Sequence, residues 1–187
     1  MEEKKWDLPA EGVLFTVETQ YHARAMGRLA CALRRTVRKK HSRISHIFGW
    51  TLIALIVFLL LPLDGAPFVW DFRTILNIVV LLALLAVLLF EDQLNGWIAW
   101  KRRLPGTEKC TTWFCEEGYY NLLESGKSEF PYDRVMQIAE TKDYFVMILS
   151  KNHGQLYAKS GLSGGTVDEF RAFLAEKTGK PVQKIKG

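Results

Sequence analysis

The residues with the most recognisable catalytic spacing form a G-x-S-x-G motif at 161–165, with Ser163 at its centre. In hydrolases such a motif lies between a strand and a helix and presents a serine nucleophile, which an acid and a histidine later in the chain activate. No histidine follows Gly165, and the remaining chain is too short to build the required sheet. His153 offers a base in a different order, but no oxyanion framework accompanies it. We therefore predict a flexible loop at 161–165 and a chain that is not an enzyme.

Other familiar kinds of chemistry find no support in the sequence. The histidines and cysteines are scattered and match neither a metal site nor a C-x-x-C motif. These residues are His22, His41, His46, His153, Cys31, Cys110 and Cys115. Glycine patterns that bind nucleotide phosphates are also missing from the sequence. The sequence therefore predicts no metal and no cofactor, and we expect the thiols to stay reduced on the cytoplasmic side of a membrane.

Basic residues flank the most apolar part of the chain, where they could bind anionic lipid headgroups. Each base contributes about 1 kcal/mol near an anionic leaflet. The candidate headgroup contacts are Arg24, Arg28, Arg35, Arg38, Lys39, Lys101, Arg102 and Arg103. The alternative is an ordinary membrane anchor, in which the basic residues only set the membrane topology. The apolar face of the helix predicted to carry the first of these bases would then pack on the helical extension of a second membrane span. The two interpretations are compatible, because one helix can pack on one face and touch lipid with the other.

The net charge is +5 and the sequence pI is about 9.1, which could indicate a nucleic-acid ligand. Much of this excess belongs to the basic cluster at 24–43, however, and the strands predicted over 108–132 carry several glutamates. The loop at 116–118, Glu-Glu-Gly, would repel the phosphates of a phosphoinositide. The sequence therefore favours a protein-binding or self-associating domain.

Two uncharged apolar runs, at 47–63 and 75–90, predict a tight transmembrane hairpin. With the apolar residues that lead into them, they approach the roughly 20 residues that cross a bilayer. Asp64, Gly65 and Pro67 form the predicted turn. A soluble core is disfavoured, because too little amphipathic chain remains to cover both runs. The tryptophans that suit the membrane interfaces are Trp50, Trp70, Trp97 and Trp100.

Lysines and arginines precede the first apolar run and follow the second, whereas the connecting loop has a single base, Arg73. The positive-inside rule therefore predicts a multi-pass cell-membrane protein with both termini in the cytoplasm. The chain divides into an N-terminal strand and basic amphipathic helix (1–46), the hairpin with a cytoplasmic helical extension (47–103), and a C-terminal domain (107–187).

The N-terminal part should contain a short strand near 13–18, followed by one amphipathic helix that opens at Thr19 and runs into the membrane. The second span should continue as a helix past Phe90. Glu91 and Asp92 would then face the basic helix. We expect carboxylate–guanidinium contacts that hold the two helical extensions together in antiparallel fashion.

The C-terminal domain alternates short apolar runs with turn residues, which predicts antiparallel strands joined by short loops. The expected strands are 108–115, 119–124, 127–132, 135–141, 144–150 and 155–159. One helix closes the chain: Thr166 and Glu169 form a capping box at its start, and Gly179 suits its end. The fold class is therefore α+β, with a helical hairpin and an antiparallel sheet or barrel closed by a C-terminal helix.

Four segments carry a resemblance to a known family: the strand FTVE at 15–18, the hairpin, the run at 129–149, and TVDEFRAFL at 166–174. In these features the chain resembles the YcxB-like family of bacterial membrane proteins. The resemblance covers nearly the whole chain and implies a pleckstrin-homology-like cytoplasmic domain, with the strand at 13–18 returning to its sheet. Some bacterial membrane proteins with related domains are implicated in tolerance of membrane-active peptides. At the level of fold analogy, the resemblance implies a role in envelope stress or antimicrobial-peptide tolerance.

The sequence supports one functional expectation and one alternative. We expect a membrane-anchored module that recruits or regulates a protein partner at the cytoplasmic leaflet. The alternative is an accessory subunit of a membrane complex such as a transporter, bound through its hairpin. The expected partners are the lipid bilayer with anionic phospholipid, an unidentified protein and a second copy of the chain, without nucleic acid.

Overall fold

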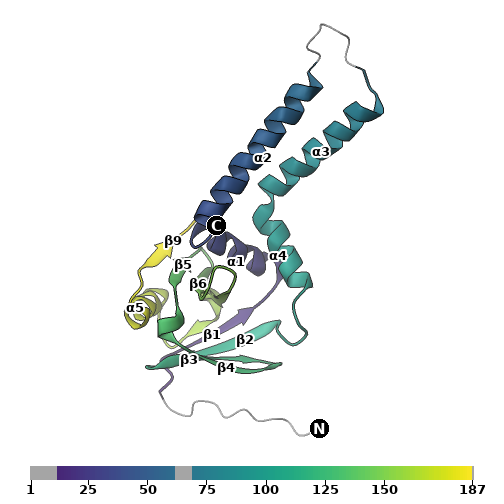
Figure 1. The fold of residues 1–187 in the computed structure, drawn as a ribbon. Helices are drawn as coiled ribbons and strands as arrows, with labels where there is room; N and C mark the ends of the chain where they lie inside the picture. Colours follow the sequence, from purple (N-terminus) through teal and green to yellow (C-terminus); the bar gives the residue numbers. More distant parts are fainter. Residues whose placement is uncertain (1–11, 62–68, 187) are drawn as a thin grey trace.

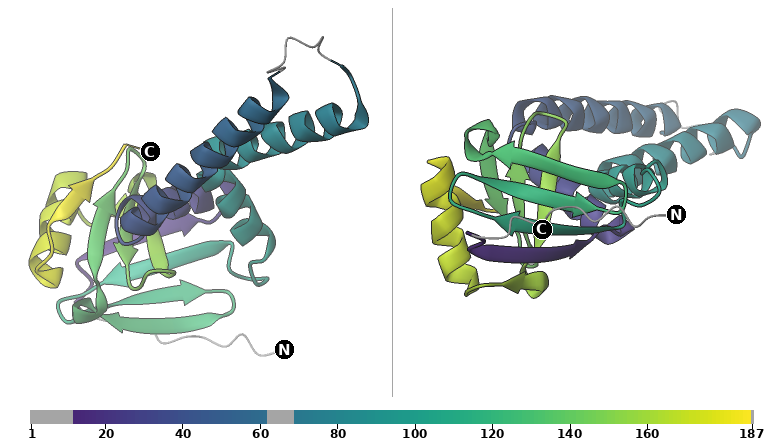
Figure 2. Two further views of the ribbon diagram at one scale, coloured as in Figure 1. Left: turned by 45° about the horizontal axis from the view of Figure 1, so that its top comes forward. Right: turned by 90° about the horizontal axis from the view of Figure 1, so that it is seen from below.

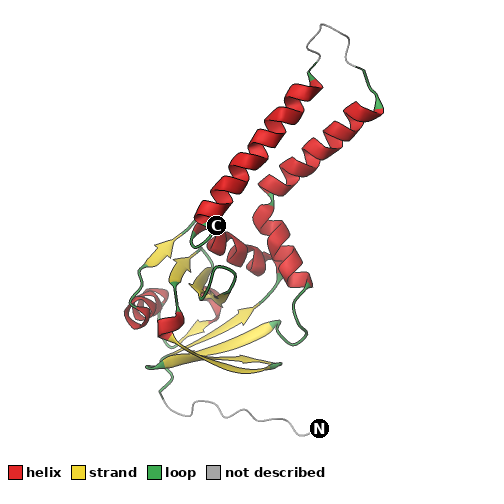
Figure 3. Ribbon diagram, viewed as in Figure 1, coloured by secondary structure: helices red, strands yellow, loops and turns green. Residues whose placement is uncertain are grey.

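Within residues 12–61 and 69–186, which the computed structural model describes, the chain forms two β-sheets and five α-helices. Figure 1 shows two long helices rising from a body that contains the sheets and the shorter helices. Figure 3 shows the same division by secondary structure, with the strands confined to the body. The predicted α+β class is therefore confirmed.

The larger sheet combines strands from distant parts of the chain. Its five strands are antiparallel to their neighbours and follow the order β4-β3-β2-β1-β8. They are β1 (Phe15–Gln20), β2 (Lys109–Phe114), β3 (Gly118–Leu123), β4 (Gly126–Pro131) and β8 (Leu162–Ser163). The pairing of β1 with β2 confirms that the N-terminal strand joins the sheet formed by later residues.

The smaller sheet has the strand order β7-β6-β5-β9. Its strands are β5 (Gln137–Glu140), β6 (Tyr144–Ile148), β7 (Gly154–Ala158) and β9 (Val182–Lys184). β9 pairs with β5 in parallel, whereas the other neighbours are antiparallel. β9 lies outside the strands expected from the sequence, and it adds the C-terminal residues to the edge of this sheet.

The two sheets do not join into a closed barrel within the described residues, which corrects the barrel alternative for the fold. Pro131 ends β4 and has no N–H to extend the ladder. The short turn η1 (Tyr132–Arg134) then carries the chain to the smaller sheet. On the opposite side, the Ala158 N–H donates to the Thr19 hydroxyl at 3.0 Å. A side chain thus bridges β1 and β7 where a barrel would need a backbone ladder.

The main core lies between the sheets, and α5 (Val167–Thr178) lies across their ends (Figure 2). Aromatic rings fill much of this core. Phe114 of β2 meets Phe170 of α5 edge-on, with ring centroids 4.9 Å apart, which is a favourable aromatic geometry. The predicted capping box is confirmed, because Thr166 and Glu169 exchange hydrogen bonds at the start of α5. The cap fixes where this helix begins.

The smaller sheet is buried on both faces, because α1 (Ala23–Arg35) covers the face that points away from the main core. Residues of β6 alternate between the two sides. Phe145 and Met147 enter the main core, whereas Val146 and Ile148 pack in the cluster that includes α1. A strand buried on both faces needs an unbroken apolar run, which β6 has. α1 is therefore part of the body and not a free surface helix.

The basic helix is not continuous with the first apolar helix, which corrects the prediction of one helix from Thr19 into the membrane. A break at 36–38 separates α1 from α2 (Lys39–Leu60). The Thr36 N–H still donates to the Ala32 carbonyl at 3.1 Å, but the Thr36 backbone leaves the helix, with φ −111° and ψ −95°. The break lets α1 pack along the smaller sheet while α2 leaves the body.

A similar break lies between the second apolar helix, α3 (Phe72–Leu89), and α4 (Glu91–Lys101). Phe90 between them has a nonhelical conformation, with φ −111° and ψ 21°. The predicted helical continuation past Phe90 is therefore present as a separate helix. The change of direction brings α4 across α1 (Figure 1).

α2 and α3 are each long and apolar enough to cross a membrane. In the described structure no residue of α3 is buried, and only three residues of α2 are. The two helices touch near the body, where a Cβ added at Gly49 would lie 2.7 Å from a Leu88 methyl carbon. The predicted turn at 64–67 lies outside the described residues. The hairpin thus leaves much of its apolar surface exposed.

Candidate functional site

Two hollows lie at the base of the apolar helices, and basic side chains line both. The first, the α1–α4 cavity, has a volume of about 660 Å³ and is bounded by α1, α4 and the end of α3. The second, the α2–β9 groove, has about 440 Å³ and lies between the start of α2 and β9. We call the bases that line them the basic belt: Arg24, Arg28, Arg34, Arg35, Lys39, Arg43, Lys184 and Lys186.

The α1–α4 cavity depends on a close crossing of its two helices at Gly27 and Gly96. Gly96 is buried, and a Cβ added to it would lie 2.3 Å from the Gly27 backbone nitrogen. Only a glycine allows the backbones to approach this closely. The crossing therefore holds the bases of α1 beside the first turns of α4.

The predicted contacts between the acids of α4 and the bases before the hairpin are confirmed. Arg34 donates to both carboxylate oxygens of Asp92, from Nε at 2.7 Å and from Nη2 at 2.5 Å. His46 Nε2 of α2 lies 2.8 Å from a carboxylate oxygen of Glu91. Hydrogen bonding to Asp92 raises the pKa of the Arg34 guanidinium above its ordinary value. These contacts join α1, α2 and α4 at the base of the hairpin.

Replacing both acids, by Glu91→Gln with Asp92→Asn, should lower the melting temperature of the detergent-solubilised protein. The expected loss is about 2 kcal/mol of unfolding free energy, because the half-buried Arg34 guanidinium would lose its charged acceptors. The control is Glu117→Gln with Glu124→Gln, which removes two exposed carboxylates elsewhere. Equal melting curves for the two double variants would contradict the role assigned to these contacts.

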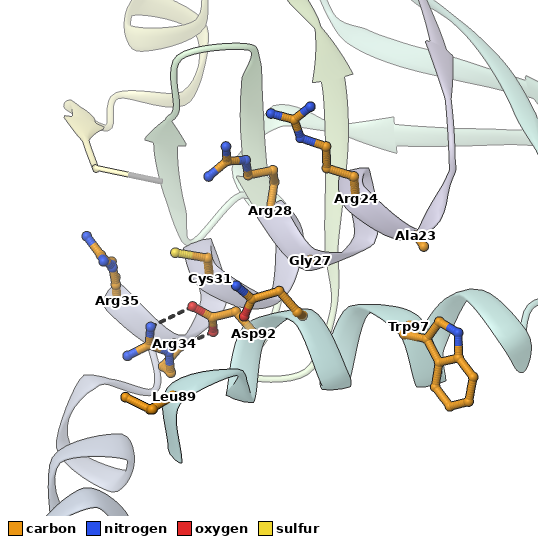
Figure 4. Close-up of a pocket in the computed structure, with 11 residues that line it drawn as sticks. Ala23, Arg24, Gly27, Arg28, Cys31, Arg34, Arg35, Leu89, Asp92 and Trp97 are labelled. Carbon is orange, nitrogen blue, oxygen red and sulfur yellow. Dashed lines mark hydrogen bonds and ion pairs between the residues drawn. The ribbon is translucent and has the colours of Figure 1, made fainter. Parts of the chain in front are cut away.

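Three further arginines of the cavity, Arg24, Arg28 and Arg35, have no carboxylate partner within 4 Å among the described residues. Figure 4 shows Arg24 and Arg28 leaving α1 on the same side. Their spacing of four residues makes them neighbours on the helix surface. Burial raises the pKa of the Tyr144 hydroxyl, and the nearby Arg24 and Arg28 oppose this shift. The cavity thus carries cationic charge that no ion pair among the described residues neutralises.

The α2–β9 groove brings together bases from opposite ends of the chain. Lys39 and Arg43 come from α2, whereas Lys184 and Lys186 come from β9 and the residues after it. The parallel pairing with β5 places them there, and the Ile185 N–H continues it by donating to the Glu140 carbonyl at 2.8 Å. Sequence reasoning missed these lysines. The only local signal is a pair of β-branched residues, at 182 and 185, after Pro181.

The predicted headgroup contacts at the far end of α4 lie outside both hollows. The Lys101 ammonium lies 4.2 Å from the centroid of the Trp97 ring, and the Arg103 guanidinium lies 4.8 Å from that of Trp100. Arg103 also donates to the Glu108 carboxylate at 3.0 Å. These two bases are engaged with neighbouring side chains, and the structure does not bring them to the cavity.

The other predicted site residues are spread over the surface. Arg38, Arg102, Trp50 and Trp70 are exposed. Trp50 lies within α2, and Trp70 lies two residues before α3, which begins at Phe72. Of the predicted interfacial tryptophans, only Trp97 lines the α1–α4 cavity.

The G-x-S-x-G motif is not a flexible loop but a segment packed against β1. The Ser163 hydroxyl donates to the Thr16 carbonyl at 3.3 Å, and β8 pairs with β1 at this point. A Cβ at Gly161 would lie 2.0 Å from the Glu18 carbonyl oxygen. At Gly164, where φ is +96°, a Cβ would lie 2.4 Å from the backbone oxygen of residue 14. Close packing therefore explains the glycines of the motif.

Comparison with known protein families gives a match within the body of the chain. A family model described as YcxB-like protein matches residues 116–174, from the turn before β3 into α5. No curated protein and no solved structure matches the chain. The matched region excludes α1, the hairpin, α4 and β9, and every residue of the basic belt lies outside it. The resemblance of the chain to the YcxB-like family is thus confirmed, through residues 116–174.

Proposed function

We propose that the chain is a non-enzymatic, membrane-anchored module that recruits or regulates a protein partner at the cytoplasmic leaflet. The observation that carries this proposal is the hairpin, whose long apolar helices stay exposed in the folded chain. Water is a poor solvent for so large a contiguous apolar surface, whereas the hydrocarbon of a bilayer suits it. The basic belt at its base then fits the anionic cytoplasmic leaflet, as the positive-inside rule requires.

The body supports a role in presenting a surface, because it is joined firmly to the anchor. α1 packs on the smaller sheet with one side and crosses α4 with another. β4 is the outer strand of the larger sheet, and Figure 1 shows it on the side of the body opposite the hairpin. An outer strand can accept an extended peptide by strand addition. α5 lies across the ends of the two sheets, where the C-terminal helix of a pleckstrin-homology-like domain would lie, and this supports the proposal that the body has such a fold.

Crosslinking in native membranes, followed by affinity purification and mass spectrometry, tests partner recruitment. The intact chain is compared with a variant in which an unrelated apolar hairpin replaces residues 50–87. A partner retained by both proteins supports recruitment through the body. A partner lost on the swap overturns it in favour of the accessory-subunit alternative, for which the open apolar face of α3 offers a surface. Recovery of no specific crosslinked protein from either form also contradicts recruitment.

The absence of catalysis at Ser163 is tested separately. We expect a fluorophosphonate probe to label the wild-type protein no more than Ser163→Ala, because the hydroxyl donates to a backbone carbonyl and has no histidine partner in the described structure. A serine hydrolase treated in parallel provides the positive control. Labelling that disappears in Ser163→Ala would contradict the non-enzymatic assignment.

A further inference from the structure

The α1–α4 cavity combines uncompensated positive charge with a position directly below an apolar helix. Its lining contains four arginines and one carboxylate, that of Asp92. Arg34 already occupies both oxygens of that carboxylate. Arg24, Arg28 and Arg35 therefore remain available to a ligand. The positive charge of these three arginines favours an anionic ligand.

From this arrangement we infer that the α1–α4 cavity binds the phosphate group of an anionic phospholipid. The inference rests on the proposed membrane anchoring and names a ligand for its cytoplasmic face. Guanidinium groups match phosphate oxygens in charge and in geometry, and two neighbouring arginines can share one phosphate. Gln93, which also lines the cavity, supplies an amide donor for a glycerol or phosphate oxygen.

The apolar part of the cavity favours a lipid over a soluble phosphate compound. Leu89 is the last residue of α3 and lines the cavity beside the start of α4. A lipid whose phosphate lies among the arginines can extend its acyl chains along α3, whose residues are all unburied. Trp97 lines the other end and can bury its ring while its indole N–H stays hydrated, as tryptophans do at membrane interfaces. The cavity therefore suits an amphiphile.

The test uses the full chain in a neutral detergent, titrated with phosphatidylglycerol or phosphatidylcholine and followed by native mass spectrometry. Arg24→Gln with Arg28→Gln removes two bases from the cavity. Lys101→Gln with Arg102→Gln removes the same charge from outside it. We expect the first pair to weaken phosphatidylglycerol binding about 30-fold, since each base near an anionic leaflet is worth about a factor of five. The second pair should change binding less than about threefold.

Three results would overturn the inference. Equal losses of phosphatidylglycerol binding in the two double variants would mean that the lipid is attracted by the overall charge of the protein and not by a specific site. Equal binding of phosphatidylglycerol and phosphatidylcholine would mean that the cavity does not distinguish an anionic headgroup from a zwitterionic one. Displacement of phosphatidylglycerol by low concentrations of inorganic phosphate or glycerol phosphate would assign the cavity to a soluble phosphate. Alkaline carbonate extraction of membranes, run in parallel, reports on anchoring alone, so failure of the proposed function is recognised separately.

Discussion

Gly96→Ala is expected to lower the unfolding free energy by about 3 kcal/mol, although it adds a single methyl group. The new Cβ would lie 2.3 Å from the Gly27 nitrogen and 2.4 Å from the Gly27 Cα. Both are backbone atoms of a helix packed on the smaller sheet, so neither can rotate away. α1 and α4 would have to separate, which would also disturb the contact between Arg34 and Asp92. Chemical unfolding of the detergent-solubilised chain, followed by tryptophan fluorescence, measures the loss.

Gly27→Ala provides a matched control, because it makes the same chemical change on the other side of the crossing. A Cβ at Gly27 would lie 3.5 Å from the Asp92 carbonyl oxygen, which is an ordinary van der Waals contact. Alanine also favours a helix over glycine by up to about 1 kcal/mol. We therefore expect Gly27→Ala to be neutral or stabilising. Similar effects of the two substitutions would contradict the crossing geometry.

Glu140→Gln should have the second large effect, a loss of about 3 kcal/mol, typical of breaking a buried ion pair. Glu140 is 5% exposed and accepts hydrogen bonds from two basic residues. Arg171 of α5 donates from Nε at 2.7 Å and from Nη2 at 2.8 Å, and the Lys159 ammonium donates at 2.6 Å. The carboxylate thus connects β5 to α5 and to the segment before β8. Its replacement leaves the Lys159 ammonium without a charged acceptor and leaves Arg171 with only the exposed Asp168 carboxylate.

The same carboxylate should make stability depend on acid pH. Hydrogen bonds from Arg171, and then from Lys159, lower the pKa of Glu140 to about 2 in the folded state. A lowered pKa contributes stability that is fully present above the ordinary glutamate value and is lost as the pH falls toward 2. Between pH 5 and pH 2 the wild type should therefore lose more unfolding free energy than Glu140→Gln. Parallel pH profiles for the two proteins would contradict the assignment.

Much of the body could be predicted from the sequence, because its signals are local. The six strands expected between 108 and 159 all appear within two residues of their predicted limits. Short turns and alternating apolar residues define such strands without reference to the rest of the fold. The cap formed by Thr166 and Glu169 is equally local. The two long apolar helices follow from composition alone.

The predictions from the sequence are wrong or incomplete where packing between distant segments determines the structure. Nothing in the sequence around Thr36 requires α1 to stop, since the residues on both sides favour a helix. The helix ends because α1 packs on the smaller sheet, and Val146 and Ile148 of that sheet lie more than a hundred positions away. β9 was missed for the same reason, because its partner strand β5 lies far earlier in the chain.

The candidate site was predictable only in part. Charge and position predict Arg24, Arg28 and Arg35 as candidate headgroup contacts, and the structure gathers these three residues in one cavity. Lys184 and Lys186 could not be identified, because only the β9 pairing brings them beside α2. Charge patterns indicate which residues can bind an anion. The tertiary fold determines which of them act together.

The most direct test of the central claim is the sidedness of the chain in native membranes. One reporter cysteine is introduced into each protein, by Val69→Cys next to α3 or by Ser128→Cys in β4, both at exposed positions. The background is Cys115→Ser, in which the remaining Cys31 and Cys110 are buried, and the background protein alone measures their labelling. A membrane-impermeant maleimide should label Val69→Cys in intact cells and Ser128→Cys only after permeabilisation. Both proteins should stay in the membrane after alkaline carbonate washing. Labelling of Ser128→Cys in intact cells, or release of the chain by carbonate, would contradict a cytoplasmic body held by a transmembrane hairpin.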